Sequence, residues 1–361
     1  MSFLFMLSTG IYLAFVLFII AGLFRHNEQS IISVDQTPFV SVVIAARNEE
    51  NNLPDLIQDL VHQEYPLDRL EVIIVNDRST DSTAQILKEA ADNFAVVKYI
   101  YIEKLSIEMT PKKHALTLGI EMAKGDVILS TDADCRVGKL WVSSMAYSVI
   151  QQNGISIGYS KVSAESFFEQ IQMLDFLGII TANAGAGGWG HFWSGTGQNL
   201  AYKKSDFEAI SGFESVQDKI SGDDMYLVQS ISKIKSGIIN LDINSFVTTA
   251  AMPTFPDFIN QRIRWSSNSK DSAMQSHLFF AFLISAFLSN ATLLLSFLFG
   301  HSWLFLFSLK FIFEGSAVFL GGKLFNTKVN PIVYAAWALA QPAYITVVGL
   351  MGLQNRYTWK T

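Results

Sequence analysis

The chain has 361 residues, of which 50% are hydrophobic and only 16% are charged, and its formal net charge is −6. This balance excludes a basic surface for nucleic acid, and the single cysteine, Cys135, excludes a disulfide framework or a metal site built from several cysteines. The apolar surplus lies at the two ends of the chain, while the charges gather between about residues 45 and 275. We therefore expect one sizeable cytoplasmic domain between membrane segments, with no nucleic-acid partner.

The first predicted element is a membrane anchor over residues 1–25. Residues 3–24 carry no charge and match the roughly 20 residues that cross the hydrocarbon core of a bilayer. Arg25 follows the apolar run, whereas a secretory signal begins with a positive region and ends in a small-residue cleavage site. The pattern predicts an uncleaved anchor with Arg25 on the cytoplasmic side.

The middle of the chain alternates short apolar runs with helical patterns, which is typical of βαβ units and a mostly parallel sheet. The predicted strands are 40–46, 70–75, 96–102 and 127–131, and the helical patterns between them are 50–63, 80–93 and 112–124. We expect an α/β domain over residues 38–270. In such sheets ligands bind beyond the carboxyl ends of the strands, where the connecting loops converge.

Polar residues follow the first two strands at this edge. Arg47 and Glu49 come after the first strand, and Asp77 follows the second. Residues 79–81 can cap the next helix, but a cap does not explain Asp77, whose carboxylate could accept hydrogen bonds from a base or ribose. Arg47 and Glu49 are placed similarly and are predicted to bind the same ligand.

Two carboxylates at one-residue spacing, Asp132 and Asp134, follow the fourth strand. Such oxygen ligands suit Mg²⁺ or Mn²⁺ that bridges phosphate oxygens, and a metal-bound diphosphate is a good leaving group. The alternative is an acidic turn that caps a helix starting near Lys139. Agreement with the other strand ends favours the metal site.

Lys112 and Lys113 follow Pro111 and open the third helical pattern. Their positive charge can add to the helix N-terminus in holding phosphate, so we expect one of them, taken as Lys112, to bind the diphosphate. An ordinary solvated pair is the alternative.

Asp223 and Asp224 follow Gly222 and precede a helical pattern over residues 225–234. A carboxylate near an acceptor hydroxyl can remove its proton as the hydroxyl attacks a sugar carbon, and Asp224 is the predicted base. A plain helix cap is the alternative.

Gln261, Arg264 and Trp265 lie just before the second apolar region. Arginine can bind a diphosphate through two parallel hydrogen bonds, and tryptophan can stack on a sugar. Juxtamembrane Arg and Trp also serve as interfacial anchors. This run therefore indicates donor binding only together with the earlier motifs.

Residues 185–190 fit GxGxxG, but they follow a helical pattern over 165–182 rather than a strand, so we expect no dinucleotide site there. Their glycines, with Trp189, Phe192 and Trp193, are expected to form a mobile loop that lines an acceptor site.

Three apolar stretches close the chain and predict a membrane region over residues 277–354. They are residues 278–299, 302–320 and 331–353. Lys310 and Glu314 lie one helical turn apart inside this region. Because a lone charge in a membrane is costly, we expect an intrahelical pair, with a grip on a substrate headgroup as the alternative.

The order of these motifs resembles the family 2 inverting glycosyltransferases, in particular the membrane-integrated branch that includes ceramide glucosyltransferases and the cellulose, chitin and hyaluronan synthases. The matching runs are AARNEE (45–50), VNDRSTDST (75–83), PKKHAL (111–116), GDVILSTDAD (125–134), SGTGQNLAYKK (194–204), GDD (222–224) and QRIRW (261–265). They cover about residues 40 to 265.

The resemblance implies a nucleotide-sugar-binding sheet of the A-type glycosyltransferase fold. It places Asp77 at the nucleotide, and Asp132 and Asp134 at the diphosphate and its metal, Mg²⁺ or Mn²⁺. Asp224 matches the family's catalytic base, and Asp223 stands beside it. The implied donor is a nucleotide-sugar, with a UDP-sugar as the first expectation.

Gln261, Arg264 and Trp265 match the family's QxxRW motif. The chain departs from the pattern at Asn76, where many relatives have Asp, and at Asp223, where many have Glu. The implied reaction is direct displacement with inversion, without a covalent enzyme intermediate.

About four membrane segments are too few for a polymer channel in a monomer. We therefore expect transfer of one sugar to a lipid or lipid-linked acceptor by a multi-pass protein of the cell's inner (plasma) membrane. A processive polysaccharide synthase is the alternative of the same class. A tethered nucleotide-sugar-binding subunit without catalysis and a small transporter are alternatives of other classes.

Overall fold

The computed structural model describes residues 2–26, 37–269, 275–298, 303–354 and 357. The chain folds into two units that are interleaved in the sequence. The sheet unit comprises Asn27–Lys161 and Ser194–Ala250, and the helical unit comprises Met1–His26, Val162–Trp193 and Ala251–Thr361.

The sequence predicts three consecutive segments, 1–25, 38–270 and 277–354. In the structure, residues 162–193 and 251–269 group with the long apolar helices. The segment ends predicted at 270, 299 and 302 lie outside the described residues. Which segments meet the membrane remains a prediction.

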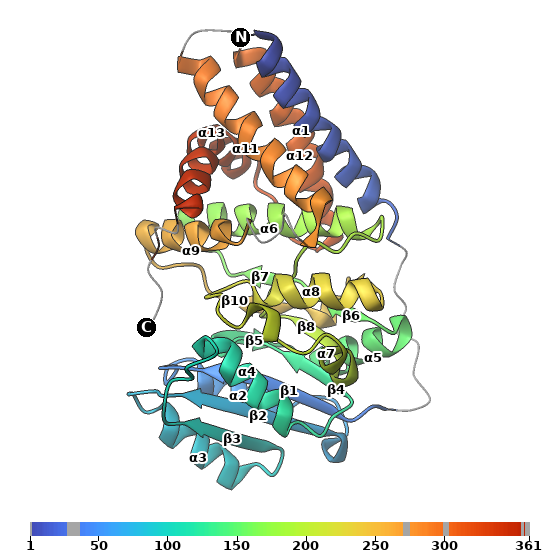
Figure 1. Cartoon of the computed structure of the whole chain (residues 1–361), viewed down its shortest axis with the longest axis vertical. Helices are drawn as coiled ribbons and strands as arrows, with labels where there is room; N and C mark the ends of the chain where they lie inside the picture. The colour runs from blue at the N-terminus through green and yellow to red at the C-terminus, as the bar shows by residue number, and fades with distance from the viewer. Residues whose placement is uncertain (1, 27–36, 270–274, 299–302, 355–356, 358–361) are drawn as a thin grey trace. The chain divides into compact units, whose positions relative to one another are not determined.

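Within the described part of the chain, the sheet unit is built on a seven-stranded sheet (Figure 1). In spatial order its strands are β3 (Val97–Ile102), β2 (Leu70–Asp77), β1 (Val40–Ala46), β4 (Val127–Ser130), β8 (Leu200–Lys203), β6 (Ile155–Ile157) and β9 (Gly237–Ile239). The first four are parallel, β8 is antiparallel to both neighbours, and β9 is parallel to β6. The predicted strands correspond to β1 through β4, and the prediction of an α/β domain with a mostly parallel sheet is confirmed.

Helices cover both faces of this sheet. They are α2 (Leu53–Val61), α3 (Thr83–Asn93), α4 (Pro111–Met122), α5 (Trp141–Gln152), α7 (Lys204–Ala209) and α8 (Asp223–Ile234). Because side chains alternate along a strand, Val42 and Ile44 of β1 pack into a core with α2 and α5, while Val43 faces α4. A Cβ on Gly119 of α4 would lie 2.5 Å from Cγ1 of Val43. This glycine therefore sets how closely α4 approaches the sheet.

A smaller sheet continues from the end of β4. In the described residues it consists of β5 (Cys135–Val137), β10 (Val247–Thr249) and β7 (Ser160–Val162), in that order. Strand β5 begins immediately after Asp134, and the next helix, α5, begins only at Trp141. The alternative that Asp132 and Asp134 cap a helix starting near Lys139 is therefore wrong, because a strand intervenes.

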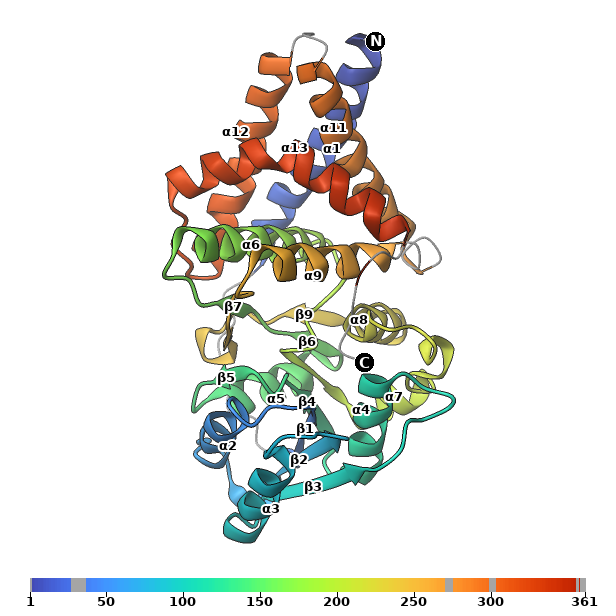
Figure 2. The same cartoon turned by 90° about the vertical axis from the view of Figure 1, so that its left-hand side faces the viewer.

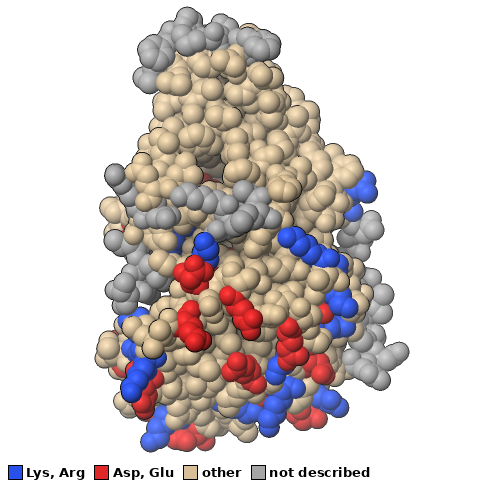
Figure 3. All heavy atoms as spheres, in the orientation of Figure 1, with Lys and Arg blue, Asp and Glu red and all other residues tan. Residues whose placement is uncertain are grey.

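The described residues of the helical unit include four long apolar helices: α1 (Ser2–Leu23), α11 (His277–Leu298), α12 (Trp303–Leu324) and α13 (Pro331–Leu353). Each is long and apolar enough to cross a membrane. On the face drawn in Figure 3 their surface is almost free of charged side chains, whereas the sheet unit exposes both signs. Helices α6 (Phe167–Gly187) and α9 (Phe255–Ser267) lie across the direction of α1 and α11 (Figure 2).

The glycine-rich run that fits GxGxxG forms a helix contact. Gly185 lies inside α6, and a Cβ on Gly22 of α1 would stand 1.8 Å from the carbonyl oxygen of Gly185. A Cβ on Gly188 would stand 2.0 Å from the carbonyl oxygen of Gly22. Trp189 then stacks on Phe18 of α1, with 5.5 Å between the ring centroids. The prediction of a mobile loop is wrong, because these glycines let α1 and α6 pack closely.

Lys310 and Glu314 of α12 form the predicted intrahelical pair, with 2.7 Å between Nζ and Oε2. Both side chains are buried. Tyr12 of α1 donates a hydrogen bond to Glu314, and Lys310 donates one to Gln341 of α13. The pair thus joins three of the long helices.

Candidate active site

Two loops at the carboxyl edge of the main sheet are held together by hydrogen bonds. The side-chain oxygen of Asn48, after β1, accepts from the N–H of Thr80 at 2.8 Å, and the N–H of Asn48 donates to Oγ of Ser79 at 2.9 Å. Asn48 has a φ of 56°, which asparagine adopts more readily than most residues. The loop that carries Glu49 is thereby fixed to the loop that follows Asp77.

Asp77 ends β2 at this edge. Its carboxylate accepts two hydrogen bonds from Arg78, at 2.7 and 3.1 Å. The neighbouring Asn76 is fully buried, and its side-chain oxygen accepts from the N–H of Ser79 at 3.0 Å. Arg47 is half-buried in the loop after β1. Because an ionised carboxylate accepts about four hydrogen bonds, Asp77 could accept further bonds from a base or ribose beside those from Arg78.

Lys112 lies between carboxylates from two different elements. Its Nζ is 2.8 Å from Oδ1 of Asp132, after β4, and 3.9 Å from Oδ2 of Asp223, in the first turn of α8. Pro111 opens α4 and places Lys112 in the first turn of that helix. Burial lowers the pKa of Lys112, but the charges of Asp132 and Asp223 outweigh it and raise the pKa above its usual value. Lys112 therefore stays protonated at physiological pH.

Lys113, the other predicted phosphate candidate, points elsewhere. It is buried, and its Nζ donates to the carbonyl oxygen of Lys219 at 2.6 Å. Burial lowers its pKa. Of the two lysines, Lys112 is the one that reaches the acidic residues.

The turn before β8 adds a backbone donor to the same cluster. The N–H of Gly197 donates to Oδ2 of Asp224 at 3.3 Å, and Oδ1 of Asp224 accepts from the N–H of Met225 at 2.7 Å. A Cβ on Gly197 would lie 3.4 Å from Nζ of Lys112 and 3.6 Å from Oδ2 of Asp223. Because β8 is antiparallel to β4, this turn lies where β4 ends and the paired aspartates follow.

Asn199, in the same turn, is a residue that sequence reasoning missed. It is fully buried, and its amide nitrogen donates to the carbonyl oxygens of Tyr159 at 2.9 Å and Ser245 at 2.7 Å. Its side-chain oxygen accepts from Nε1 of Trp141 at 2.9 Å. These three bonds fix the turn that carries Gly197. The signal available in the sequence is the run SGTGQN, whose small and amide residues are typical of a tight polar turn.

Two acidic residues of the cluster, Asp134 and Asp224, have a raised pKa. Burial, together with the charge of Asp223, raises the pKa of Asp224 to about 6. Although much of the Asp134 side chain is exposed, partial burial and the charges of Asp132 and Glu49 raise its pKa to about 6. A raised carboxyl pKa means that the charged form is destabilised. The charged forms of Asp134 and Asp224 are thus disfavoured at this edge of the sheet.

The donor set limits how a divalent cation could bind. Across the described ranges, no group of three or more His, Cys, Asp or Glu side chains is arranged to hold a metal ion. Asp132 and Asp134 offer two carboxylates. Proteins usually supply one or two carboxylates to a Mg²⁺ ion that also binds substrate phosphates and water. Their oxygen atoms and the raised pKa of Asp134 fit a cation that completes its coordination on a diphosphate.

Gln261, Arg264 and Trp265 lie on α9 in the helical unit. The side-chain oxygen of Gln261 accepts a hydrogen bond from Arg262, whose guanidinium lies 4.3 Å from the centre of the Trp265 ring. That these residues join the acidic cluster remains a prediction.

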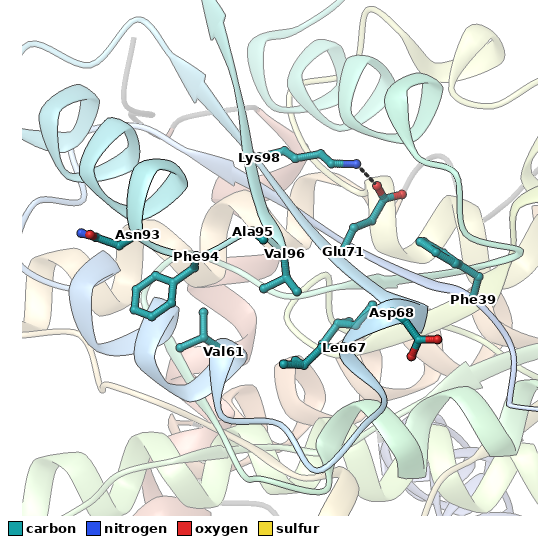
Figure 4. A pocket seen from close by; sticks show the side chains of 11 residues that line it. Phe39, Val61, Leu67, Asp68, Glu71, Asn93, Phe94, Ala95, Val96 and Lys98 are labelled. Carbon is teal, nitrogen blue, oxygen red and sulfur yellow. Dashed lines mark hydrogen bonds and ion pairs between the residues drawn. The ribbon is translucent and has the colours of Figure 1, made fainter.

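A pocket lies at the amino-terminal end of β2, the opposite end from Asp77 (Figure 4). Phe39 and Phe94 line it, and Lys98 and Glu71 point toward each other and pair at 2.6 Å. Glu71 also accepts hydrogen bonds from a serine hydroxyl and a backbone N–H. Burial opposes its charge, but these bonds lower the pKa of Glu71. The charged pair is therefore satisfied within the domain.

A parallel α/β sheet with aspartates and a lysine at its carboxyl edge is a typical site for a phosphorylated ligand. Residues 41–210, a little under half of the chain, match the model of Glycosyl transferase family 2. Over these residues the chain is therefore similar to glycosyl transferase family 2. The matched segment includes Asp77, Lys112, Asp132, Asp134 and Gly197.

Curated relatives belong to the same class. The chain is 28% identical to the probable glycosyltransferase YdaM of Bacillus subtilis over 72% of its own length and 63% of that protein. It is 36% identical to a beta-monoglucosyldiacylglycerol synthase of a Nostoc species, over 31% of its own length and 23% of that protein. The chain thus spans less than two thirds of either relative.

Among solved structures, the chain resembles the mannosyltransferase PcManGT from Pyrobaculum calidifontis, which was determined in complex with GDP-Man and Mn²⁺. The TM-score is 0.67, the sequence identity is 18%, and the match covers 98% of this chain and 99% of that one. At this identity the likeness establishes the fold. The predicted A-type glycosyltransferase fold flanked by apolar helices is therefore confirmed.

Proposed function

We propose that this protein is a membrane-bound, inverting glycosyltransferase that moves one sugar from a nucleotide-sugar to a lipid or lipid-linked acceptor. The observation that carries the proposal is the environment of Asp224. Its carboxylate has a raised pKa and is held by the N–H of Gly197, in the same cluster as Lys112 and Asp132. A base of this kind serves an acceptor hydroxyl, and a protein that only binds a nucleotide-sugar has no need of it.

Asp224 takes the proton of the acceptor hydroxyl while the hydroxyl oxygen forms a bond to the anomeric carbon of the donor sugar. The bond from that carbon to the diphosphate oxygen breaks, and the nucleoside diphosphate leaves with the electron pair. Because the hydroxyl attacks opposite the leaving group in a single step, the configuration is inverted and no covalent enzyme intermediate forms. Asp223 helps to raise the pKa of Asp224 to about 6, so the base is ionised at neutral pH yet still accepts a proton.

The diphosphate is held by Lys112 and by the side of the cluster that contains Asp132 and Asp134. Lys112 stays protonated, and its Nζ can share its hydrogens between Asp132 and a phosphate oxygen. Asp132 and Asp134 would hold Mg²⁺ or Mn²⁺, which when bound offsets the charge that develops on the leaving diphosphate. The Mn²⁺ in the PcManGT complex supports a metal of this kind.

The nucleoside part of the donor is bound by Asp77, with Arg47 and Glu49 beside it at the ends of β2 and β1. A UDP-sugar is the expected donor, although PcManGT binds GDP-Man. The experiment below therefore compares donors with a uracil base and with a guanine base.

Gln261, Arg264 and Trp265 of α9 complete the donor site in this proposal. The guanidinium of Arg264 matches a diphosphate, and the ring of Trp265 offers a flat surface for the sugar. The order of motifs along the chain supports this assignment.

The acceptor is a membrane lipid or a lipid-linked molecule. Four described helices have the length and composition of membrane spans. The similarity to a beta-monoglucosyldiacylglycerol synthase also supports an acceptor of this class. The proposal places the protein in the inner (plasma) membrane with the sheet unit in the cytoplasm.

The test uses membranes that contain the full chain. They are incubated with radiolabelled UDP-glucose, UDP-N-acetylglucosamine or GDP-mannose, with Mn²⁺ or with EDTA, and the lipids are then extracted and separated. One donor should label one lipid, and the label should disappear with EDTA and with Asp224→Asn. Asp218→Asn makes the same chemical change at an exposed position and should keep activity.

Label in a polymer that stays in the aqueous phase would identify a processive synthase and contradict single transfer. Binding of UDP or GDP without transfer from any of the three donors would favour a non-catalytic binding subunit. Full transfer by Asp224→Asn would show that the base is a different group.

A further inference from the structure

We propose that Asp175 is a positioning residue for the donor site. Acting through Arg262, it fixes the side chains of Gln261 and Trp265 on α9. The inference rests on the proposed function, in which these two side chains contact the nucleotide-sugar. All four residues belong to the helical unit.

Asp175 is an acidic residue buried in the middle of α6, between apolar neighbours. Its Oδ2 lies 2.6 Å from Nε of Arg262 and accepts from the hydroxyl of Tyr344 at 3.3 Å. Its Oδ1 accepts from Nε1 of Trp337 at 3.1 Å. A buried carboxylate is stable only with such partners. Partners on both α9 and α13 therefore fix the position of the Asp175 side chain.

Arg262 lies inside the QRIRW run but is not one of the three residues that match QxxRW. Its guanidinium stands 4.3 Å from the centre of the Trp265 ring and 4.5 Å from that of Phe258. It also donates a hydrogen bond to the side-chain oxygen of Gln261. A planar cation attracts aromatic faces and donates in fixed directions, so one group holds both Gln261 and Trp265.

The ion pair with Asp175 sets the orientation of the Arg262 guanidinium. Without a carboxylate at 175, Arg262 would be a buried charge without its ionic partner, and it would have to move toward water. Gln261 and Trp265 would then lose the group that orients them.

Support for Asp175 comes from one face of α13. Trp337, Gln341 and Tyr344 are spaced by four and three residues, so they share a face of that helix. Trp337 and Tyr344 bond to Asp175, and Gln341 accepts from Lys310. The orientation of the α9 motif is thus linked to the packing of the long helices.

The experiment compares Asp175→Asn with Asp257→Asn in the full chain. Asp257 is exposed in the first turn of α9, so its variant is a matched control for loss of one carboxylate. For Asp175→Asn, kcat/KM for the nucleotide-sugar used in transfer should fall by about tenfold to a hundredfold, mainly through KM, as expected for displaced binding groups. Asp257→Asn should change kcat/KM by less than about twofold.

A second readout does not need catalysis. Hydrogen exchange of the peptide over residues 255–268 should speed up by about tenfold in Asp175→Asn and stay unchanged in Asp257→Asn, because local opening of α9 becomes easier. Arg262→Lys keeps the charge but loses the planar contacts, so it should be intermediate in both readouts.

Unchanged kcat/KM together with unchanged exchange in a folded Asp175→Asn protein would overturn the inference. If that variant does not fold, Tyr344→Phe and Trp337→Phe each remove one donor, and unchanged KM in both would overturn it equally. If the wild-type chain transfers no sugar while α9 responds as expected, the proposed function fails and the positioning of α9 stands.

Discussion

The helical unit and the carboxyl edge of the main sheet treat charge in opposite ways. In the helical unit, Lys310 pairs with Glu314 at 2.7 Å and Arg262 pairs with Asp175 at 2.6 Å. Neighbouring helices supply further hydrogen bonds to both pairs. Such charges are satisfied without a ligand, so their role is to hold helices in place.

At the carboxyl edge of the main sheet, acidic residues gather around Lys112. Lys112 serves both Asp132 and Asp223, while Asp134 and Asp224 have their pKa raised to about 6. The free energy of this arrangement improves when a positive charge or a proton arrives. The difference teaches that a cluster with raised carboxyl pKa values indicates a ligand site, whereas a cluster of paired ions indicates structure.

Replacing Asp224 by Asn tests the acidic cluster at the sheet edge and should have the largest effect. The rate of sugar transfer should fall by about 10³-fold, the size expected for loss of a general base, because the amide cannot take the acceptor's proton. Binding of UDP should change little. Initial rates with a radiolabelled donor and calorimetric titration with UDP measure the two effects, with Asp218→Asn as the control. A transfer rate within tenfold of wild type would remove Asp224 from this role.

Replacing Lys310 by Met tests the satisfied clusters. It leaves Glu314 buried without its cation, and the free energy of unfolding should drop by about 3 kcal/mol or more. Lys310→Met combined with Glu314→Gln removes both charges and should recover most of the loss. Unfolding in mixed detergent micelles measures both proteins. If the single and double variants lose the same stability, the pair is not the source of the effect.

The pH dependence of transfer should report the raised pKa of Asp224. A carboxyl group with a pKa of about 6 takes up a proton as pH falls through 6, and the protonated form cannot act as a base. Below that pH, kcat/KM should fall by about tenfold per pH unit, and above it kcat/KM should level off. A flat profile from pH 7 down to pH 5 would contradict a base with this pKa.

The raised pKa of Asp224 should also affect protein stability, but with the opposite dependence on pH: transfer increases as pH rises, whereas the stability of the folded protein decreases. This effect should be smaller. The folded-state pKa of Asp224 is about 6 against an unfolded value of 3.8, so the folded protein loses stability as pH rises from about 4 to 6. Asp224→Asn removes this penalty and should raise the free energy of unfolding at pH 7 by about 1 kcal/mol, discounted for partial exposure. Thermal unfolding at pH 7 and pH 4 tests the sign, since the gain should vanish at pH 4.

Much of the sheet unit could be predicted because its signals are local. Strands β1, β2 and β4 are short apolar runs that lead into polar residues such as Asp77 and Asp132. The start of α8 at Asp223 follows from Gly222, which has a φ of 84° suited to glycine. Local patterns also indicated which edge of the sheet holds the acidic residues.

Other features depend on long-range packing and could not be read from the sequence. Whether Lys112 or Lys113 faces the cluster depends on how α4 is rotated against the sheet, where Gly119 lies against Val43. The glycines that form the contact between α1 and α6 look like a loop until their partner helix is known. Asp175 is a single acid in an apolar helix, which indicates a buried partner but does not name Arg262.

The interleaving of the two units has a practical consequence for anyone who wishes to study a water-soluble fragment. Cutting the chain at residues 38 and 270 would keep α6 and α9 but discard α1, α12 and α13. Helix α6 packs against all three of these, and α9 packs against α13. The fragment would carry newly bared apolar helix faces, which promote aggregation. Handling the protein in detergent or nanodiscs with all its helices avoids this, because the unit that contains QRIRW is completed by the two ends of the chain.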